Sequence, residues 1–121
     1  MSFLSYIYTM RETTPFEIEV YLTVEGRAPF SQWLGALKDL KGRALIRVRL
    51  DRLSLGNFGD CNPIGEGLHE LRIDFGPGYR VYFGQKGKQL VLLLCGGTKR
   101  TQKRDIAQAQ EYWADFRKRT S

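Results

Sequence analysis

Hydrophobic and polar residues alternate along several segments of the chain, and this alternation predicts β-strands. It runs through residues 16–22, where β-branched and aromatic side chains are frequent, and it returns in residues 68–75 and 79–83. A period of two is typical of a strand with one face in the core, and the Gly-Pro-Gly sequence at 76–78 is typical of a turn between paired strands. Residues 90–95 are apolar at every position, which predicts a central strand covered on both faces.

Apolar residues recur at three- and four-residue intervals in three other segments, which predicts amphipathic helices. The first begins at Pro29, the second covers about 43–53, and the third opens at Thr101 and extends to the basic residues at 117–119. Residues 56–67 are rich in Gly, Asn, Asp and Pro and show no periodicity. We therefore expect a surface loop there.

The resulting order, β-α-α-β-β-β-α, predicts a single compact α+β domain. In it, a helical hairpin and a C-terminal helix pack on a mainly antiparallel four-stranded sheet. The length of 121 residues suits one domain and is too short for two substantial ones. We assign the domain to residues 15–119 and expect residues 1–14 to form a flexible N-terminal extension, with Met10 as an alternative start of the natural chain.

Composition excludes several classes of protein. No apolar run approaches the roughly 20 residues of a membrane helix, and the start of the chain lacks the basic residue and cleavage site of a secretory signal. Cys61 and Cys95 do not form a C-x-x-C motif and are expected to be reduced thiols of a cytoplasmic protein. We expect no metal site and no cofactor. The only histidine, His69, rules out a ribonuclease mechanism that needs two histidines in one chain.

Positive charge is concentrated in the predicted helices. The formal net charge is +6. Residues 38–52 carry six Lys and Arg against two Asp, among them Arg43, Arg47 and Arg49, and residues 99–119 carry seven against three acidic residues. Charge separated in this way is typical of a surface that binds a polyanion such as nucleic acid. The alternative is that these side chains only solvate the helix surfaces.

A second cationic group is predicted on the sheet. Because side chains alternate across a strand, Arg72, Arg80 and Tyr82 are expected on one face of two paired strands. Four further cations follow the central strand and open the last helix: Lys99, Arg100, Lys103 and Arg104. Such a cluster would bind a phosphodiester and stabilise charge on its oxygens, and repulsion among cations lowers the pKa of a lysine, which favours proton transfer. The alternative is that Arg72 pairs with Glu70 or Asp74 and only stabilises the sheet surface.

Three sequence motifs on these strands resemble the RelE/ParE superfamily of toxins from toxin–antitoxin systems. They are GLHELR at 67–72, GPGYRVY at 76–82, and the apolar strand at 90–94 followed by GGTKRTQK at 96–103. The HigB-like branch, that of the phage-type addiction module killer proteins, is the most similar. The resemblance covers about residues 15–118 and includes the PF-x-x-WL pattern that begins at Pro29. The expected order of elements agrees with the fold of that superfamily.

The resemblance implies a toxin of a type II toxin–antitoxin module. Such toxins cleave messenger RNA, usually in the ribosomal A site, and are neutralised by a helix-turn-helix antitoxin encoded beside them. The implied reaction is attack of the RNA 2′-hydroxyl on the scissile phosphate, with no metal and no cofactor. The implied partners are therefore the antitoxin, the ribosome and mRNA, with no membrane.

The resemblance also implies roles for individual residues. Arg72 and Arg80 correspond to ligands of the phosphate or of the transition state. Lys99, Arg100 and Lys103 correspond to positioning cations and proton-transfer groups. Apart from the resemblance, the charge of the helical regions predicts RNA-binding roles for Arg100, Arg104, Arg43, Arg47 and Arg49.

One departure from the superfamily concerns proton transfer. Some RNA-cleaving relatives carry a catalytic tyrosine early in the last helix, whereas Tyr112 lies well inside it. Either Tyr82 or a lysine acting alone would take its place. Two other functions also remain open: a ParE-like inhibitor of a protein such as DNA gyrase, and an inactive module that binds the antitoxin.

Overall fold

The structure is a computed structural model and describes residues 16–121. The flexible extension expected at residues 1–14 lies outside the described residues. In chain order the elements are β1 (Glu17–Val20), α2 (Pro29–Ala36), α3 (Leu40–Ser54), β2 (Cys61–Gly65), β3 (Leu68–Ile73), β4 (Tyr79–Lys86), β5 (Leu90–Thr98), the 3-10 turn η1 (Lys99–Thr101) and α4 (Gln102–Thr120). None of the helices within this part of the chain combines the length and the apolar character needed to cross a membrane.

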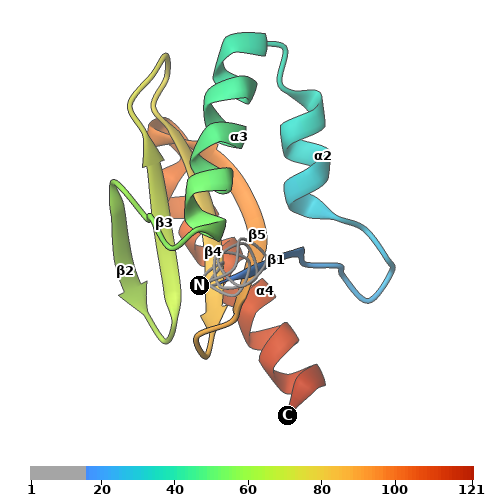
Figure 1. Ribbon diagram of the computed structural model, residues 1–121. Coiled ribbons are helices and arrows are strands. Elements are labelled where there is room, and N and C mark those ends of the chain that lie inside the picture. Colours follow the sequence, from blue (N-terminus) through green and yellow to red (C-terminus); the bar gives the residue numbers. More distant parts are fainter. Residues whose placement is uncertain (1–15) are drawn as a thin grey trace, which may run out of the picture.

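Five strands form one mixed sheet in the order β1-β5-β4-β3-β2. β1 runs parallel to β5, whereas the pairs β5–β4, β4–β3 and β3–β2 are antiparallel. Figure 1 shows α2 and α3 on one face of this sheet and α4 on the other. The prediction of a single, mainly antiparallel α+β domain is therefore confirmed.

The predicted sheet of four strands is one strand short. The stretch at 61–65 forms the edge strand β2, which pairs antiparallel with β3, so the expectation of a loop across 56–67 is wrong for this stretch. Pro63 and the nearby glycines hid the strand, because an edge strand tolerates a proline that a central strand does not. Glu66, at a φ of 55°, and the glycines on either side of it then make the turn into β3.

The sheet has a hydrophobic core on each face. On one face, Phe30 of α2 and Leu53 of α3 pack against apolar residues of β3, β4 and β5. On the other face, Ala109 and Trp113 of α4 pack against the residues that point the opposite way. Every residue from 91 to 95 in β5 is buried, which confirms the predicted strand covered on both faces. β5 lies inside the sheet between β1 and β4, and the centre of the five strands is β4.

Contacts at the end of the β3–β4 hairpin join it to both helical layers. Asp39, the N-cap of α3, accepts hydrogen bonds from Gly42 N (2.9 Å) and from Tyr79 Oη (2.7 Å). On the other side, Lys99 N donates to the carbonyl of Gly78 (2.8 Å). Gly78 has a φ of 78°, a conformation that favours glycine. The turn therefore lies beside the start of η1 and is held there.

Candidate functional site

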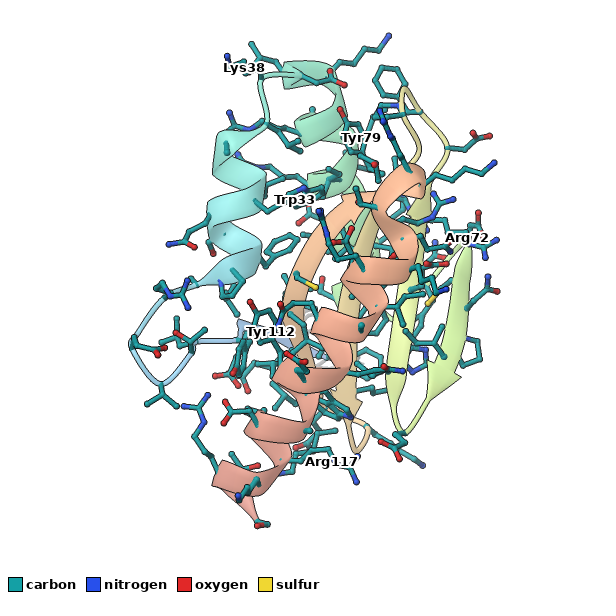
Figure 2. All side chains as sticks on the ribbon, turned by 180° about the vertical axis from the view of Figure 1, so that it is seen from behind. Trp33, Lys38, Arg72, Tyr79, Tyr112 and Arg117 are labelled. Atoms are coloured by element: carbon teal, nitrogen blue, oxygen red, sulfur yellow. The ribbon has the colours of Figure 1, made fainter. Side chains whose placement is uncertain are left out.

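Arg72 of β3 and Arg80 of β4 are direct partners in the antiparallel ladder. Their side chains lie on the face of the sheet that α4 covers, because the adjacent Leu71 and Val81 face the core under α2 and α3. The prediction that the two arginines share one face is confirmed. Figure 2 looks onto this side of the molecule and shows Arg72 on the β2 side of α4.

A cleft of about 330 Å³ opens beside these two arginines. Its lining brings together three cations, which are Arg72, Arg80 and Lys99, and the acidic side chains of Asp60 and Asp74. The hairpin turn forms one end of the cleft, where a Cβ at position 78 would lie 3.4 Å from Arg80 Nη1 and 3.3 Å from Lys99 Cβ. The cleft has the size and the charge to receive a phosphate group.

Arg80 is the most deeply buried cation of this cleft, with 9% of its surface exposed. Its Nη1 donates to the Tyr79 carbonyl (3.2 Å), and its buried Nε has no hydrogen-bond partner among residues 16–121. No carboxylate in that part of the chain forms an ion pair with it. Burying a guanidinium without a counter-charge is costly. An anion in the cleft would remove that cost.

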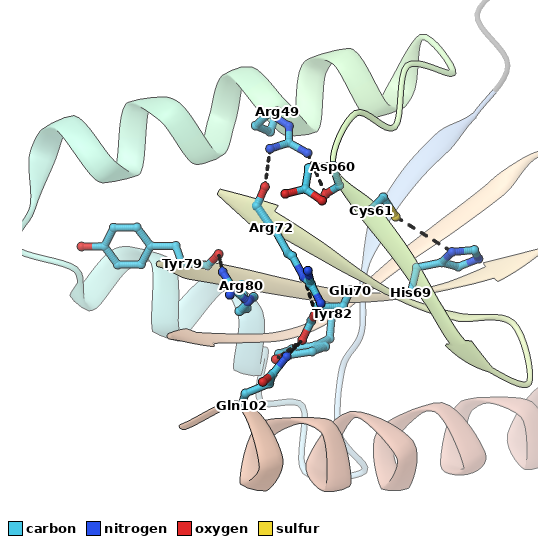
Figure 3. A network of polar contacts seen from close by, with 10 residues as sticks. All are labelled: Arg49, Asp60, Cys61, His69, Glu70, Arg72, Tyr79, Arg80, Tyr82 and Gln102. Atoms are coloured by element: carbon cyan, nitrogen blue, oxygen red, sulfur yellow. Dashed lines mark hydrogen bonds and ion pairs between the residues drawn. The ribbon is translucent and has the colours of Figure 1, made fainter. Parts of the chain in front are cut away.

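Arg72 is held differently, by a carboxylate on its own strand. Its Nε donates to Glu70 Oε1 (2.9 Å), as Figure 3 shows. The ion pair with Glu70 that the sequence left open as an alternative is therefore present. When the Asn62 amide is turned so that its oxygen faces the guanidinium, it accepts from Arg72 Nη2 (2.7 Å). The Arg72 side chain stays 39% exposed, so these contacts leave it accessible from the cleft.

Glu70 is a buried carboxylate, 1% exposed, that joins β3, β4 and α4. Its Oε2 accepts from Tyr82 Oη (3.0 Å) and from Gln102 Nε2 (2.7 Å), while its Oε1 accepts from Arg72. Burial raises the pKa of Glu70, but the hydrogen bonds from Gln102, Arg72 and Tyr82 outweigh it and hold the pKa below its ordinary value. Glu70 is therefore ionised at neutral pH. Sequence reasoning named Glu70 only as an ion-pair partner and missed Gln102, although Gln102 belongs to the motif at 96–103.

Tyr82 is fully buried, and its hydroxyl donates to Glu70. Desolvation, together with the neighbouring Glu70 carboxylate, raises the pKa of Tyr82 far above its ordinary value. The structure does not support the proton-transfer role considered for this residue, because the phenol is shielded from solvent and does not ionise at neutral pH. Its hydroxyl instead orients the Glu70 carboxylate.

The four cations that follow β5 divide between two adjacent surfaces. Lys99 lines the cleft, whereas Arg100, Lys103 and Arg104 line a shallow depression of about 540 Å³ along the first turns of α4. All four residues are exposed. Because Lys99 and Arg100 are consecutive in η1, the cationic surface continues from the cleft onto α4.

The predicted RNA-binding arginines of α3 do not line the cleft. Arg43 and Arg47 line a separate depression on α3, which covers the opposite face of the sheet from α4 (Figure 1). The guanidinium of Arg49 donates hydrogen bonds to three backbone carbonyls, those of Arg72, Phe58 (3.2 Å) and Asp60 (3.1 Å). Arg49 is among the predicted RNA-binding residues, but these bonds tie α3 to β3 and to the chain before β2, which is a structural role.

His69 and both cysteines lie outside the lining of the cleft. His69 stacks on Phe83, with ring centroids 5.0 Å apart, and burial lowers its pKa. Cys61 and Cys95 are free thiols, as predicted. Across residues 16–121, no three His, Cys, Asp or Glu side chains are grouped so that they could hold a metal ion.

Fold and site together define a small α+β protein with a cationic cleft between a β-hairpin and the start of a helix. No protein-family model matches the chain. The chain is 52% identical over 81 residues to an uncharacterised protein of Haemophilus influenzae, and the match covers 67% of this chain and 82% of that protein. The chain belongs to the same family as that protein.

Proposed function

We propose that the protein is the toxin of a type II toxin–antitoxin module and that it cleaves mRNA on the ribosome. Two features support the proposal: the motifs that resemble the HigB-like branch of the RelE/ParE superfamily, and the cleft in which three cations of those motifs, Arg72, Arg80 and Lys99, come together. The order of elements, apart from the added edge strand β2, is the order expected for a RelE-like fold. We therefore assign the domain to that fold as part of the proposal.

The burial of Arg80 is the observation that carries the proposal. Arg80 is nine-tenths buried as a residue, its buried Nε has no partner within residues 16–121, and a second arginine lies opposite it in the ladder. An anion in the cleft would satisfy this charge, and the non-bridging oxygens of a phosphodiester match the geometry of guanidinium donors. A backbone phosphate of RNA is the ligand that also agrees with the sequence resemblance.

In the proposed reaction the RNA 2′-hydroxyl attacks the adjacent phosphorus in line with O5′. The O2′–P bond forms and the P–O5′ bond breaks, which leaves a 2′,3′-cyclic phosphate and a free 5′-hydroxyl. Arg72 and Arg80 stabilise the charge that grows on the non-bridging oxygens. Lys99 lines the cleft, and we assign to it the donation of a proton to the departing O5′, while the proton of the 2′-hydroxyl passes to water. Lys103 would position the phosphate from the α4 side.

The remaining cations suit contacts with RNA or with the antitoxin. Arg100 and Arg104 lie on the depression next to the cleft, where they would meet RNA that flanks the scissile bond. Arg43 and Arg47 lie on α3, where they would meet either ribosomal RNA or an acidic segment of the antitoxin. Both kinds of contact would weaken as salt concentration rises.

The test combines the purified chain with translating ribosomes and a defined mRNA, and maps the mRNA 5′ ends. New ends are expected with the wild-type protein. Arg80→Lys and Arg72→Ala should each slow cleavage by about 10²-fold. Arg117→Ala should cleave normally, because Arg117 is an exposed α4 residue far from the cleft (Figure 2). Intact mRNA at saturating wild-type protein would overturn the nuclease proposal.

Growth assays with the same variants separate the nuclease from the other two functions. Growth arrest that persists in the double variant Arg72→Ala, Arg80→Ala, together with inhibited DNA gyrase, would favour a ParE-like inhibitor. Absence of growth arrest when the wild-type chain is produced without antitoxin would favour an inactive antitoxin-binding module. Growth arrest that depends on both arginines is the outcome expected of the nuclease.

A further inference from the structure

The buried carboxylate of Glu70 connects Arg72 to the helix that follows the cationic turn. Glu70 accepts hydrogen bonds from Arg72 on β3, Tyr82 on β4 and Gln102 at the start of α4. Figure 3 shows these four side chains as one network. Of the four, Arg72 is the residue that also lines the cleft. The network therefore ends at the cleft, on Arg72, whose terminal nitrogens do not bond to Glu70.

We propose that Glu70 is a positioning residue that presents Arg72 to an RNA phosphate. This inference rests on the proposed function, because it takes RNA as the ligand of the cleft. Glu70 engages the Nε of Arg72. Both terminal nitrogens lie near the turned Asn62 oxygen, Nη2 at 2.7 Å and Nη1 at 3.2 Å, and each carries a second N–H that can donate to a phosphate oxygen. Tyr82 and Gln102 hold the carboxylate and so act on Arg72 through Glu70.

Two physical effects oppose the position of Arg72 and explain why it needs a carboxylate. Arg72 lies directly opposite Arg80, and like charges at paired positions repel each other. A side chain that is 39% exposed also has many rotamers open to it. Without Glu70, repulsion from Arg80 would favour the rotamers that point into solvent. Glu70 therefore keeps Arg72 directed to the cleft that Arg80 also lines.

The test measures binding of a 2′-O-methyl RNA oligonucleotide, which has no free 2′-hydroxyl and is not cleaved, to the full chain. Glu70→Gln removes the charge and keeps the size of the side chain. We expect Arg72→Ala to weaken binding about tenfold and Glu70→Gln to weaken it about threefold or more. Glu70→Gln made in the Arg72→Ala background should weaken binding no further, because the weakening passes through Arg72.

Other outcomes of this double-mutant cycle would overturn the inference. Equal losses in both backgrounds would mean that Glu70 acts on the fold as a whole. Unchanged or tighter binding would mean that Arg72 needs no such hold, since loss of a negative charge near the cleft by itself favours an anion. Asp115→Asn is the matched control, because Asp115 also accepts from a tyrosine and an arginine, Tyr21 and Arg119, but lies near the other end of α4. It should leave binding unchanged.

NMR of the Arg72 side chain separates failure of this inference from failure of the proposed function. If the wild-type chain neither cleaves mRNA on translating ribosomes nor binds the oligonucleotide, the proposed function fails, but the hold of Glu70 on Arg72 is still measurable. An arginine Nε–H bonded to a buried carboxylate is protected from exchange with water, and Arg72→Lys identifies its resonance by loss. Glu70→Gln is expected to abolish that resonance and Asp115→Asn to keep it. An unchanged resonance in Glu70→Gln would overturn the positioning role even without RNA.

Discussion

Arg72 and Arg80 face each other across the β3–β4 ladder. Of these two arginines, only Arg72 has a carboxylate partner among residues 16–121. Like charges at opposed positions destabilise a sheet. Glu70 offsets this effect for Arg72, whereas Arg80 is buried with an unpaired Nε. The pair is poorly explained as a source of stability. It agrees with the proposed anion site, for which the fold would give up stability.

Arg80→Met is therefore expected to raise the free energy of unfolding by about 1 kcal/mol, because it removes a buried charge without a partner. The same change should abolish binding of the 2′-O-methyl RNA oligonucleotide. Urea unfolding and an equilibrium binding assay measure the two effects. Arg117→Met is the control: it removes an exposed arginine that pairs with Glu66 (3.5 Å), and its effect on stability should stay below about 0.5 kcal/mol. A clear loss of stability in Arg80→Met would show that Arg80 serves the fold.

Arg49 and Arg47 are two residues apart on α3, but their removal should affect the free energy of unfolding very differently. Arg49→Ala is expected to lower the free energy of unfolding by about 2–3 kcal/mol, since its guanidinium bonds to three backbone carbonyls. Arg47→Ala should change it by less than about 0.5 kcal/mol, because Arg47 is exposed. Chemical unfolding of both variants provides the comparison. Equal effects on stability would contradict the structural role of Arg49.

The sequence predicted those parts of the fold whose burial imposes a pattern. Alternation located β3 and β4, and the continuous apolar run located β5, because strands covered on one face or on both faces must have these patterns. β2 escaped prediction for a physical reason. Its place in the sheet depends on pairing with β3, while Pro63 and the neighbouring glycines are typical of loops.

The candidate site shows the same limit. Alternation placed Arg72 and Arg80 on one face, and the ladder confirms this. The hydrogen bond between Gln102 and Glu70 joins residues 32 positions apart. It depends on where α4 crosses the sheet, and the spacing of residues within a short segment of sequence does not predict that position. The bonds of Arg49 depend in the same way on how α3 lies over β3, so from the sequence its charge is indistinguishable from that of a surface cation.

Gly84→Ala is expected to lower the free energy of unfolding by about 2 kcal/mol or more. A Cβ at Gly84 would overlap the ring of Trp113, which is buried and whose Nε1 donates to the Glu66 carbonyl (2.7 Å). The ring therefore has little freedom to move aside. Gly35→Ala is the control, since a Cβ at this exposed α2 position meets nothing within 4 Å and should stabilise the helix by about 0.5–1 kcal/mol. If urea unfolding finds the same free energy of unfolding for Gly84→Ala as for the wild type, Trp113 packs less tightly than the structure indicates.

Both cysteines are expected to react slowly with iodoacetamide in the folded protein. Burial raises the pKa of Cys61 to about 11 and that of Cys95 to about 12, and the thiolate is the reactive form. Unfolding in denaturant should restore ordinary reactivity to both. Mass spectrometry over time counts the labelled sites in each state. Labelling of folded Cys95 at the rate of the unfolded chain would contradict its burial.

The stability contributed by the charge of Glu70 is expected to be present at neutral pH and lost in acid. Burial raises the pKa of Glu70, yet the hydrogen bonds from Gln102, Arg72 and Tyr82 outweigh it, so the folded-state pKa lies below the ordinary value of 4.5. The unfolded chain therefore binds more protons in this range, and the free energy of unfolding rises with pH. The contribution is complete above about pH 5 and disappears as pH falls through the lowered folded-state pKa.

Comparison of the wild type with Glu70→Gln isolates this contribution, because glutamine does not titrate. The difference in their free energies of unfolding should be largest near neutral pH and should shrink below about pH 4. Subtraction is necessary because Asp39 and Asp115 also have lowered pKa values, owing chiefly to hydrogen bonds from Gly42 and Tyr21, and both proteins lose that stability in the same range. Urea unfolding at a series of pH values measures the difference. If it stays constant from about pH 7 to about pH 3, Glu70 stabilises the protein through its shape and not through its charge.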